Sequence, residues 1–348
     1  MTEVIALVGA QFGSEGKGVI AHYMADRFDV HIRTGGPNAG HSFKYMGRTF
    51  KQRSVPCGWT NPLATLIIGR GALLDPHVLL EEIAEIELFD PNIRDRLLID
   101  ENAWCITDED RDGEADAGMQ GSIGSTLEGV GHARAVQISR NPDKDRRVKQ
   151  RKGEWGEDFR IVDTIEMLHK RFLNGSRRVL LEGTQGTGLS LIHGQWPYCT
   201  SADTTASTLA AMAGIPAQTM RCLMVARTFP IRVAGNSGPL FEETSWDHIS
   251  GIVGRPTKEQ TTVTKKTRRV GFWDHELFER SVWLNAPSWV ALTFADYLDP
   301  NVTGVTHLKD LSAEVRLFID MIERVSKCPV ALVGTGGDQW SVVERYVI

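Results

Sequence analysis

The residues from Val8 to Gly18, VGAQFGSEGKG, could hold a phosphate group. An apolar run (4–9) leads into a glycine-rich turn with one lysine, and a helical pattern follows. Such a turn offers backbone N–H groups, the positive end of a helix dipole and a mobile ammonium. Its spacing does not match the common phosphate or dinucleotide motifs, since Gln11 and Gly18 stand where a glycine and a hydroxyl belong. Ser14 lies in the middle of the turn, and the alternative is a tight turn that merely requires glycine.

Three later segments also carry polar groups suited to chemistry. In RTGGPNAGHS (33–42), Asn38 can hydrogen-bond a phosphate or the edge of a base. His41 can donate a proton near neutral pH, although a lone histidine after a strand is often structural. The polar loop from Leu181 to Ser207 is dense in Gly and Thr, and such long loops are uncommon unless functional.

The third segment is QTTVTKKTRRVGFWD (260–274), where hydroxyl groups stand beside Lys265, Lys266, Arg268 and Arg269. Arginine offers a planar fork that binds carboxylates through two hydrogen bonds. This mixture suits a small dicarboxylate, and a solvated charged loop is the alternative interpretation.

The elements that must position these segments are short apolar strands and amphipathic helices. Apolar runs occur at 4–9, 30–34, 64–69, 179–184, 222–226, 289–294 and 330–335. A 3.6-residue apolar period predicts helices at 19–28, 79–86 and 161–172. This alternation predicts an α/β fold with a mainly parallel central sheet and helices on both faces. In such sheets the ligand loops follow the carboxyl ends of the strands.

Composition describes an ordinary globular protein of 348 residues. Apolar residues make up 41% and charged residues 24%, with a net charge of −5. A pI near 6.1 argues against a nucleic-acid-binding protein. The five cysteines are far apart, which predicts reduced thiols. No apolar stretch suits a membrane span and the N-terminus does not resemble a signal peptide, so we expect a cytoplasmic protein.

Two stretches are expected to be less ordered than the rest. Residues 107–135 are rich in Gly, Asp and Glu, and residues 140–154 form a basic run. No change in composition marks a linker, so one domain over residues 1–348 with long functional loops is predicted.

The order and wording of the motifs resemble the adenylosuccinate synthetase family. The chain reads GSEGKG, GGPNAGH, EGTQGTG with HGQWPYCTSADTT, then TT with RRVGFWD, and finally GTGGD. The resemblance extends over most of the chain. It implies a fold related to the P-loop NTPases and a reaction in which a nucleoside triphosphate phosphorylates the 6-oxygen of a purine monophosphate. The amine of L-aspartate then displaces that phosphate.

The resemblance also implies residue roles. Lys17 would neutralise the phosphoryl group in transit, and His41 would hydrogen-bond the purine 6-oxygen as general acid. Ser14 completes the expected catalytic set, and Ser14 and Gly40 are the expected Mg²⁺ ligands. Arg140 would reach the site of a neighbouring subunit, which implies a homodimer. The triphosphate is assigned to Gly13, Ser14, Glu15, Gly16, Lys17, Gly18, Gly40, His41, Ser42, Asp296, Thr335 and Gly336; the monophosphate to Ser14, Asn38, Ser125, Thr126, Arg140, Gln185 and Thr200; and aspartate to Thr261, Thr262, Val263, Thr264 and Arg268.

Three departures from the family pattern affect the substrates. The family turn G-D-E-G-K-G reads G-S-E-G-K-G here, so Ser14 replaces an aspartate that takes the purine N1 proton and binds Mg²⁺. The guanine-reading T-K-x-D reads Thr293-Phe294-Ala295-Asp296, without its lysine. The arginine-rich aspartate loop is diluted to TTVTKKTRR.

These departures predict a changed substrate rather than a lost activity. Serine is smaller than aspartate and neutral, which leaves room beside purine N1 and C2 for the 2-amino group of guanine. The combination resembles the phage 2-aminoadenylosuccinate synthetases, which join aspartate to dGMP and give 6-succino-2-amino-2′-deoxyadenylate for 2-aminoadenine DNA. If a phage encodes the chain, the cytoplasm is that of the host. ATP or dATP is the expected donor, with GTP the alternative. A synthetase acting on IMP and a silent nucleotide-binding homologue remain alternative functions.

Overall fold

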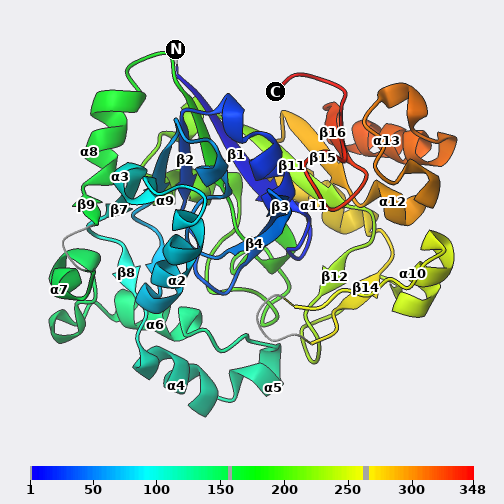
Figure 1. The fold of residues 1–348 in the computed structure, drawn as a ribbon. Helices are drawn as coiled ribbons and strands as arrows, with labels where there is room; N and C mark the ends of the chain where they lie inside the picture. The colour runs from blue at the N-terminus through cyan, green and yellow to red at the C-terminus, as the bar shows by residue number, and fades with distance from the viewer. Residues whose placement is uncertain (1, 156–158, 262–265) are drawn as a thin grey trace.

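A ten-stranded sheet forms the centre of the protein in the computed structural model, which describes residues 2–155, 159–261 and 266–348 (Figure 1). All neighbouring strands in the sheet run parallel except β16 and β17. In spatial order the strands are β17 (Val342–Glu344), β16 (Val330–Gly334), β15 (Trp289–Thr293), β11 (Met220–Arg227), β1 (Glu3–Gly9), β10 (Arg178–Glu182), β2 (Val30–Arg33), β5 (Thr65–Ile68), β7 (Leu97–Asp100) and β9 (Arg160–Val162).

The seven apolar runs predicted as strands all belong to this sheet. They are β1, β2, β5, β10, β11, β15 and β16, and each is almost fully buried. Runs of buried Val, Ile and Leu are typical of strands covered on both faces. The edge strands β9 and β17, and β7 next to β9, were not predicted from the sequence.

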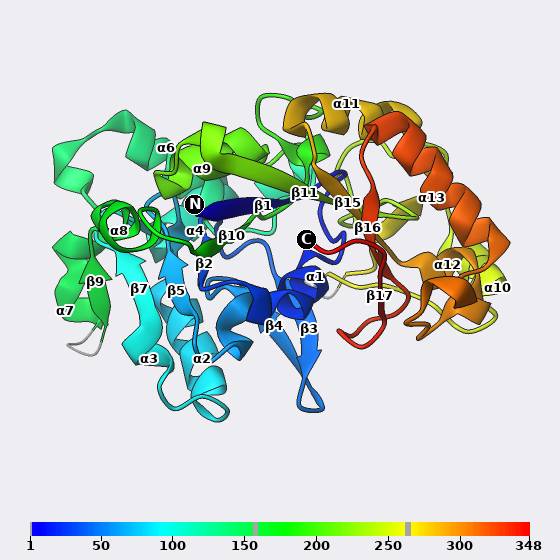
Figure 2. The ribbon, with the colours of Figure 1, turned by 90° about the horizontal axis from the view of Figure 1, so that it is seen from above.

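Helices cover the two faces of the sheet, which Figure 2 shows edge-on. Ile5 and Leu7 of β1 face α1 (Lys17–Tyr23), α2 (Pro76–Glu87) and the hairpin of β3 (His41–Tyr45) and β4 (Arg48–Gln52). Val4 and Ala6 face the other way, towards α9 (Ala206–Ala213), α11 (His275–Asn285) and α13 (Ala313–Ser326). The alternation along β1 therefore supplies one hydrophobic core on each face. The predicted α/β class is confirmed.

The sequence motifs follow the carboxyl ends of adjacent parallel strands. The glycine-rich turn follows β1, the segment 33–42 follows β2, and the loop that begins at Glu182 follows β10. On the other side of β1, β11 ends at Arg227, β15 at Thr293 and β16 at Gly334. Because carboxyl ends of parallel strands meet at one edge, all these segments meet there.

Three sequence expectations need correction. Ile161 lies on β9 rather than on a helix, and the predicted helix shrinks to α8 (Thr164–Met167) with a π-helical turn (Leu168–Phe172). Residues 107–135 are largely helical and form α4 (Asp108–Asp116), α5 (Met119–Ile123) and most of α6 (Val130–Ser139). In the basic run, Arg146 pairs with Glu109 and Asp110 and Lys144 pairs with Glu109, so these two charges are neutralised by α4 rather than solvated.

The remaining elements lie around the sheet. They are α3 (Ile93–Arg96), α7 (Lys152–Trp155), α10 (Trp246–Val253), α12 (Ala295–Leu298), β6 (Leu73–Leu74), β8 (Trp104–Cys105), β12 (Ile231–Arg232), β13 (Glu243–Thr244) and β14 (Arg269–Gly271). The five cysteines are free thiols, as predicted. Within the described ranges, no helix has the length and apolar character needed to cross a bilayer.

Candidate active site

The turn between β1 and α1 adopts a conformation that few side chains tolerate. Gly13, Ser14 and Gly16 have φ angles of 85°, 57° and 83°. Glycine reaches this region at little cost, whereas a serine there is uncommon and requires support from its surroundings. That support includes Arg227, whose Nη1 donates to the Ser14 carbonyl at 3.0 Å. The backbone therefore presents Ser14 at a fixed position in the turn.

Two buried charges hold the inside of the turn. Glu15 Oε1 accepts hydrogen bonds from the backbone N–H groups of Gln11 at 3.1 Å and Gly13 at 2.8 Å. Lys17 Nζ lies 2.6 Å from Glu15 Oε2 and donates to the Gln185 carbonyl at 2.5 Å. The Lys17 ammonium is thus fixed at the start of α1 and hydrogen-bonded to the loop after β10. Glu15 stabilises the conformation of the turn.

A glycine brings the second motif against the first. A Cβ at Gly18 would lie 2.9 Å from the His41 Cβ, so only glycine lets α1 approach the start of β3 this closely. Lys17 and His41, which belong to two separate motifs, therefore line the same cavity with Ser14 and Gly40.

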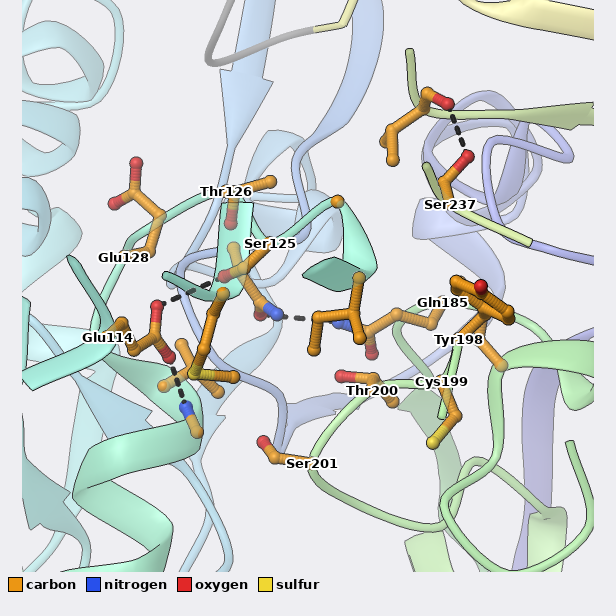
Figure 3. Close-up of a pocket in the computed structure, with 18 of the residues that line it drawn as sticks. Glu114, Ser125, Thr126, Glu128, Gln185, Tyr198, Cys199, Thr200, Ser201 and Ser237 are labelled. Atoms are coloured by element: carbon orange, nitrogen blue, oxygen red, sulfur yellow. Dashed lines mark hydrogen bonds between the residues drawn. The ribbon is translucent and has the colours of Figure 1, made fainter. Parts of the chain in front are cut away.

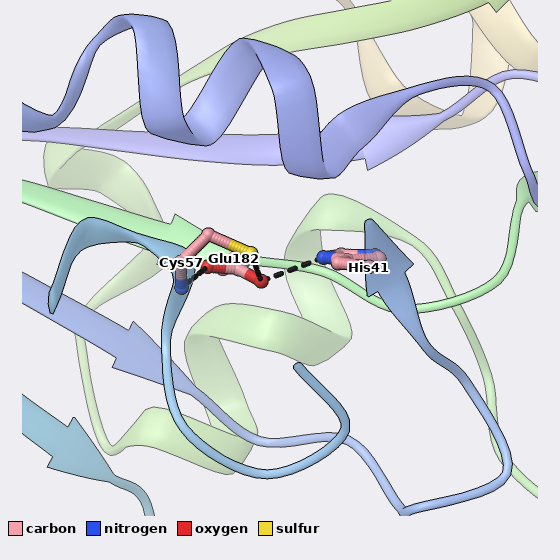
Figure 4. A group of neighbouring side chains, drawn as sticks. All are labelled: His41, Cys57 and Glu182. Atoms are coloured by element: carbon pink, nitrogen blue, oxygen red, sulfur yellow. Dashed lines mark hydrogen bonds and ion pairs between the residues drawn. The ribbon is translucent and has the colours of Figure 1, made fainter. Parts of the chain in front are cut away.

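His41 is oriented by a buried carboxylate at the end of β10 (Figure 4). Its Nδ1 lies 2.6 Å from Glu182 Oε1, and Arg33 Nη1 donates to the same oxygen at 2.5 Å. The Cys57 backbone N–H donates to the other oxygen at 2.7 Å. A proton on Nδ1 satisfies the carboxylate and leaves Nε2 of His41 for a ligand. Glu182 is therefore the residue that positions His41.

The charges around His41 favour a neutral ring in the free site. Burial and the nearby Arg33 guanidinium lower the pKa of His41 to about 4. Burial alone favours the neutral acid of Glu182, yet the His41 hydrogen bond and Arg33 hold the pKa of Glu182 well below its usual range. Burial also raises the pKa of the Cys57 thiol. His41, Cys57 and Glu182 lie close enough to suggest a metal centre, but Arg33 already neutralises the carboxylate.

Buried histidines give the protein an acid sensitivity. We expect the free energy of unfolding to fall as the pH drops from about 6.5 towards about 4, because an unfolded histidine titrates near ~6.5. Burial lowers the pKa of His22, His31 and His41 to about 4, so the stability they contribute is complete above the unfolded pKa and is lost on acidification. Glu82 has the opposite effect, because burial raises its pKa to about 7 and it therefore releases about one proton on unfolding in this pH range.

The net uptake of about two protons on unfolding gives a slope of about 2.7 kcal/mol per pH unit. Urea unfolding midpoints measured across this range test the expectation. A flat profile would mean that these histidines are already protonated in the folded protein.

The cleft continues from Lys17 and His41 into a second cavity of about 160 Å³ (Figure 3). Asn38, Thr126 and Gln185 line both parts. In Figure 3, Ser125 and Thr126 face Gln185 and Thr200 across the cavity. The Gln185 amide donates to Asn38 Oδ1 at 3.2 Å. Hydroxyl and amide groups from three separate loops thus converge on one space, as required to hold a phosphate and a base edge.

Glu114 of α4 orders the Thr126 side of this cavity. Its carboxylate accepts hydrogen bonds from Ser125 Oγ at 3.2 Å, the Gly129 N–H at 3.1 Å and the Gly131 N–H at 2.6 Å. The acidic sequence around Glu114 therefore serves to fix the loop that carries the hydroxyls.

Ser14 and Arg268 join the two remaining motifs. Arg268 Nη1 donates to Ser14 Oγ at 2.5 Å, and burial lowers the pKa of Arg268. Thr261 also lines this part of the cleft. Thr262, Val263 and Thr264 lie outside the described residues. Among the described residues that line this part of the cleft, none carries a carboxylate.

The predicted base-reading segment adjoins the phosphate turn. Thr293 Oγ1 donates to the Glu15 carbonyl at 2.6 Å, so the end of β15 touches the turn. Asp296 is 4% exposed and accepts from Arg255 at 3.2 Å, and burial raises the pKa of Asp296. The Thr335 hydroxyl is buried and donates to the Val305 carbonyl at 2.7 Å, while the Thr335 N–H donates to the Ser341 carbonyl at 2.8 Å and the Thr335 carbonyl accepts from the Gly304 N–H at 3.0 Å.

Two predicted residues, Ser42 and Arg140, lie at the surface, and a third, Gly336, is half-buried. Ser42 on β3 is exposed next to His41, and Gly336 packs near Ser341 beyond β16. Arg140 is exposed and caps the carboxyl end of α6. The first turn of α6 lines the cavity, so Arg140 lies about 15 Å along the helix from its own site.

Several residues of the site were not predicted from the sequence. Glu182 and Arg33 orient His41, while Arg227 supports Ser14 and donates to Glu259 Oε1 at 2.5 Å. A charged residue at the end of an otherwise apolar strand was the available signal, because Arg33, Glu182 and Arg227 each end one.

Comparisons with known proteins agree with this geometry. A sequence model of the family described as adenylosuccinate synthetase matches residues 6–150 and 143–301. The adenylosuccinate synthetase of Methanocaldococcus jannaschii is 36% identical over 345 residues, which cover 97% of this chain and 95% of the relative. That of Pyrococcus horikoshii is 35% identical over 348 residues and 98% of each chain.

Two solved structures share the fold. Cyanophage S-2L succinoaminodeoxyadenylate synthetase (PurZ), bound to dGMP and to dATP as an energy donor, matches with a TM-score of 0.84 and 30% identity. The match covers 100% of this chain and 96% of PurZ. The fully ligated Plasmodium falciparum adenylosuccinate synthetase matches with a TM-score of 0.87 and 20% identity, covering 99% of this chain and 100% of the other. The sequence matches span nearly the whole chain at more than 30% identity, and the protein is therefore a C–N bond-forming ligase of the adenylosuccinate synthetase family.

Proposed function

We propose that the protein joins L-aspartate to carbon 6 of dGMP and forms 6-succino-2-amino-2′-deoxyadenylate, a precursor of 2-aminoadenine in DNA. The observation that carries the proposal is Ser14. It stands in the cleft where the family has an aspartate, and none of the described residues that line this part of the cleft carries a carboxylate. The structurally similar cyanophage PurZ was solved with dGMP bound, which supports this choice.

The size and charge of Ser14 favour guanine. A hydroxymethyl group leaves space beside purine N1 and C2, and Arg268 already satisfies its oxygen. The 2-amino group can therefore enter without displacing a charged acceptor. A purine without that group would lose both the contact and the carboxylate that normally activates N1, so hypoxanthine should be held and activated poorly.

The reaction proceeds in two transfers. The purine loses its N1 proton through Ser14 or a bound water, and the 6-oxygen forms a bond to the terminal phosphorus of the donor while the diphosphate leaves. The aspartate amine then attacks carbon 6, and the 6-phosphate leaves as inorganic phosphate. Lys17 supplies a fixed positive charge to the phosphoryl group. His41, held by Glu182, becomes cationic when the phosphates bind and donates from Nε2 to the 6-oxygen.

Mg²⁺ is expected to reach this site with the triphosphate. Mg²⁺ takes oxygen ligands, and it usually keeps several waters and binds substrate phosphates as well. The residues therefore fit such a metal, because Gly40 and Ser14 line the cleft and could add the Gly40 carbonyl and Ser14 Oγ to those ligands. When bound, it neutralises charge on the donor phosphates. Ser14 Oγ accepts from the cationic Arg268, so Ser14 could serve as a ligand only after Arg268 has moved.

L-aspartate is assigned to the space between Thr261 and Arg268. Both line the cleft on the side of Ser14, and the Arg268 guanidinium offers the fork that a carboxylate prefers. We also propose that the whole chain, 1–348, works as one domain with a triphosphate donor carrying adenine.

IMP is the second candidate substrate. The archaeal adenylosuccinate synthetases are 35% to 36% identical to this chain, slightly more than the cyanophage enzyme at 30%. The test is to supply aspartate, Mg²⁺ and ATP with one monophosphate at a time and to identify the product by mass. Adduct from IMP alone would overturn the dGMP proposal, and no adduct from either would indicate a silent homologue.

We further propose a homodimer in which Arg140 completes the site of the other subunit. Mixing Arg140→Ala with Lys17→Ala is then expected to restore activity, because one site of each mixed dimer has both residues. Random exchange of subunits yields about a quarter of the wild-type activity. Activity that equals the mean of the two unmixed variants would show that Arg140 does not act across the interface.

A further inference from the structure

We propose that Arg255 selects the phosphoryl donor, by forming with Asp296 a hydrogen-bonding pair that matches the Watson–Crick edge of adenine and opposes that of guanine. This inference rests on the proposed function only in requiring a purine nucleoside triphosphate as donor. It does not depend on which monophosphate accepts the phosphoryl group.

The position of the pair follows from the sheet. β15 ends two strands from β1 in the parallel sheet, and Thr293 Oγ1 bonds to the Glu15 carbonyl at 2.6 Å. A Cβ at Gly16 would lie 3.7 Å from Phe294 Cε2. A triphosphate seated on the glycine-rich turn therefore meets the segment 293–296 with the rest of its nucleotide. Asp296 is the acidic side chain in that segment.

Asp296 is not a bare carboxylate. It is 4% exposed, and its Oδ2 accepts a hydrogen bond from Arg255 Nη2 at 3.2 Å. Arg255 is about half exposed, with 51% of its side chain accessible, so further N–H groups of the guanidinium remain open to a ligand. The Asp296 carboxylate also accepts its own backbone N–H, so its acceptor capacity is partly used, and the pair offers the remaining acceptor capacity of Asp296 beside one or more donors from Arg255.

Adenine and guanine differ in what they present to such a pair. Adenine offers the N6 amino donor beside the N1 acceptor, which matches one acceptor and one donor. Guanine offers two adjacent donors, N1–H and N2–H, which bind best to two carboxylate oxygens that hold no other donor. Against guanine, an Arg255 N–H would face a base N–H, or Asp296 would have to share its oxygens between Arg255 and both base donors. The pair thus favours ATP and dATP alike.

The other groups around the base do not distinguish the two purines. The Phe294 ring is covered on one face by Arg227, whose guanidinium carbon is 3.9 Å from the ring centroid, and Tyr297 packs at its edge. An aromatic surface stacks on either purine, since both have a π-face. Discrimination therefore falls to the hydrogen-bonding pair.

The test compares kcat/KM for ATP with kcat/KM for GTP in the wild type and in Arg255→Ala. We expect the wild type to prefer ATP, and the variant to lose at least ~10-fold of that preference, the lower end of what a two-bond contact supplies. The KM for aspartate should not change, because Arg255 does not line that part of the cleft. Arg221→Ala is the matched control. Arg221 is 53% exposed and pairs with Glu3 at the other end of the sheet, so its removal should leave the ratio unchanged.

Displacement of a fluorescent ATP analogue by ATP or GTP gives the ratio of the two dissociation constants without turnover, so the base preference can be tested even if the monophosphate assignment fails. An unchanged ATP-to-GTP ratio in Arg255→Ala overturns the inference. A wild type that prefers GTP overturns it as well, because Asp296 would then accept guanine despite its partner.

Discussion

Turnover is expected to fall at least ~10²-fold when Lys17 or His41 is replaced by alanine, which is the scale of one lost electrostatic or acid–base group. Lys17 is 2% exposed and fixed by Glu15 and the Gln185 carbonyl, so its charge is already in place before the phosphoryl group moves. His41 is fixed by Glu182 with Nε2 directed to the ligand side. Steady-state rates at saturating substrates measure the loss.

The Lys17 variant needs a structural control. Removing Lys17 leaves Glu15 buried without its cation, and breaking a buried pair costs about 3–5 kcal/mol of stability. The double variant Lys17→Ala, Glu15→Gln removes that charge and should fold while remaining inactive. His41→Asn is the corresponding control at the second position, because Glu182 keeps its bonds to Arg33 and the Cys57 N–H. Near-normal turnover in a folded variant would remove that residue from the mechanism.

Replacing Ser14 with aspartate is expected to reverse the choice of purine. The new carboxylate would occupy the space for the 2-amino group and pair with Arg268, which lies 2.5 Å from the present hydroxyl. It would also restore a base for the N1 proton. We expect kcat/KM for dGMP to fall at least ~10-fold and activity on IMP to appear, since a polar contact can discriminate on this scale or more.

The backbone should tolerate this change. Aspartate is among the residues that adopt positive φ, so the 57° at position 14 remains accessible. Ser14→Asn is the matched control, because asparagine is about as large as aspartate but carries no charge. Unchanged turnover of dGMP in Ser14→Asp would mean that Ser14 is only a turn residue.

The fold could be predicted where the apolar pattern is strong. β1, β10 and β11 are continuous apolar runs because helices cover them on both faces. Near the edges this pattern weakens. β9 is three residues long, with an exposed arginine and two half-buried residues, so Ile161 was assigned to a helical pattern. Residues 107–135 were taken as less ordered because their order depends on distant partners, such as the bonds of Glu114 to the Gly129 and Gly131 N–H groups.

The site could be predicted where residues lie in motifs, and not where it depends on pairs. The motifs identify Lys17, His41 and Gln185, which the structure brings into one cleft. No spacing rule connects Glu182 with His41 or Arg255 with Asp296. These residues are 141 and 41 positions apart and meet only because their strands and helices pack side by side. The roles of these buried charges could therefore not be predicted from the sequence, because each role depends on a partner that only the folded structure reveals.

The central claim is that this cleft selects dGMP over IMP, and a competition experiment tests it most directly. Equal concentrations of dGMP and IMP are supplied together with aspartate, Mg²⁺ and ATP, and the two succino adducts are separated by mass as they form. Their initial ratio equals the ratio of the two kcat/KM values, independent of enzyme concentration. We expect the dGMP adduct to dominate by at least ~10-fold. An excess of the IMP adduct would contradict it.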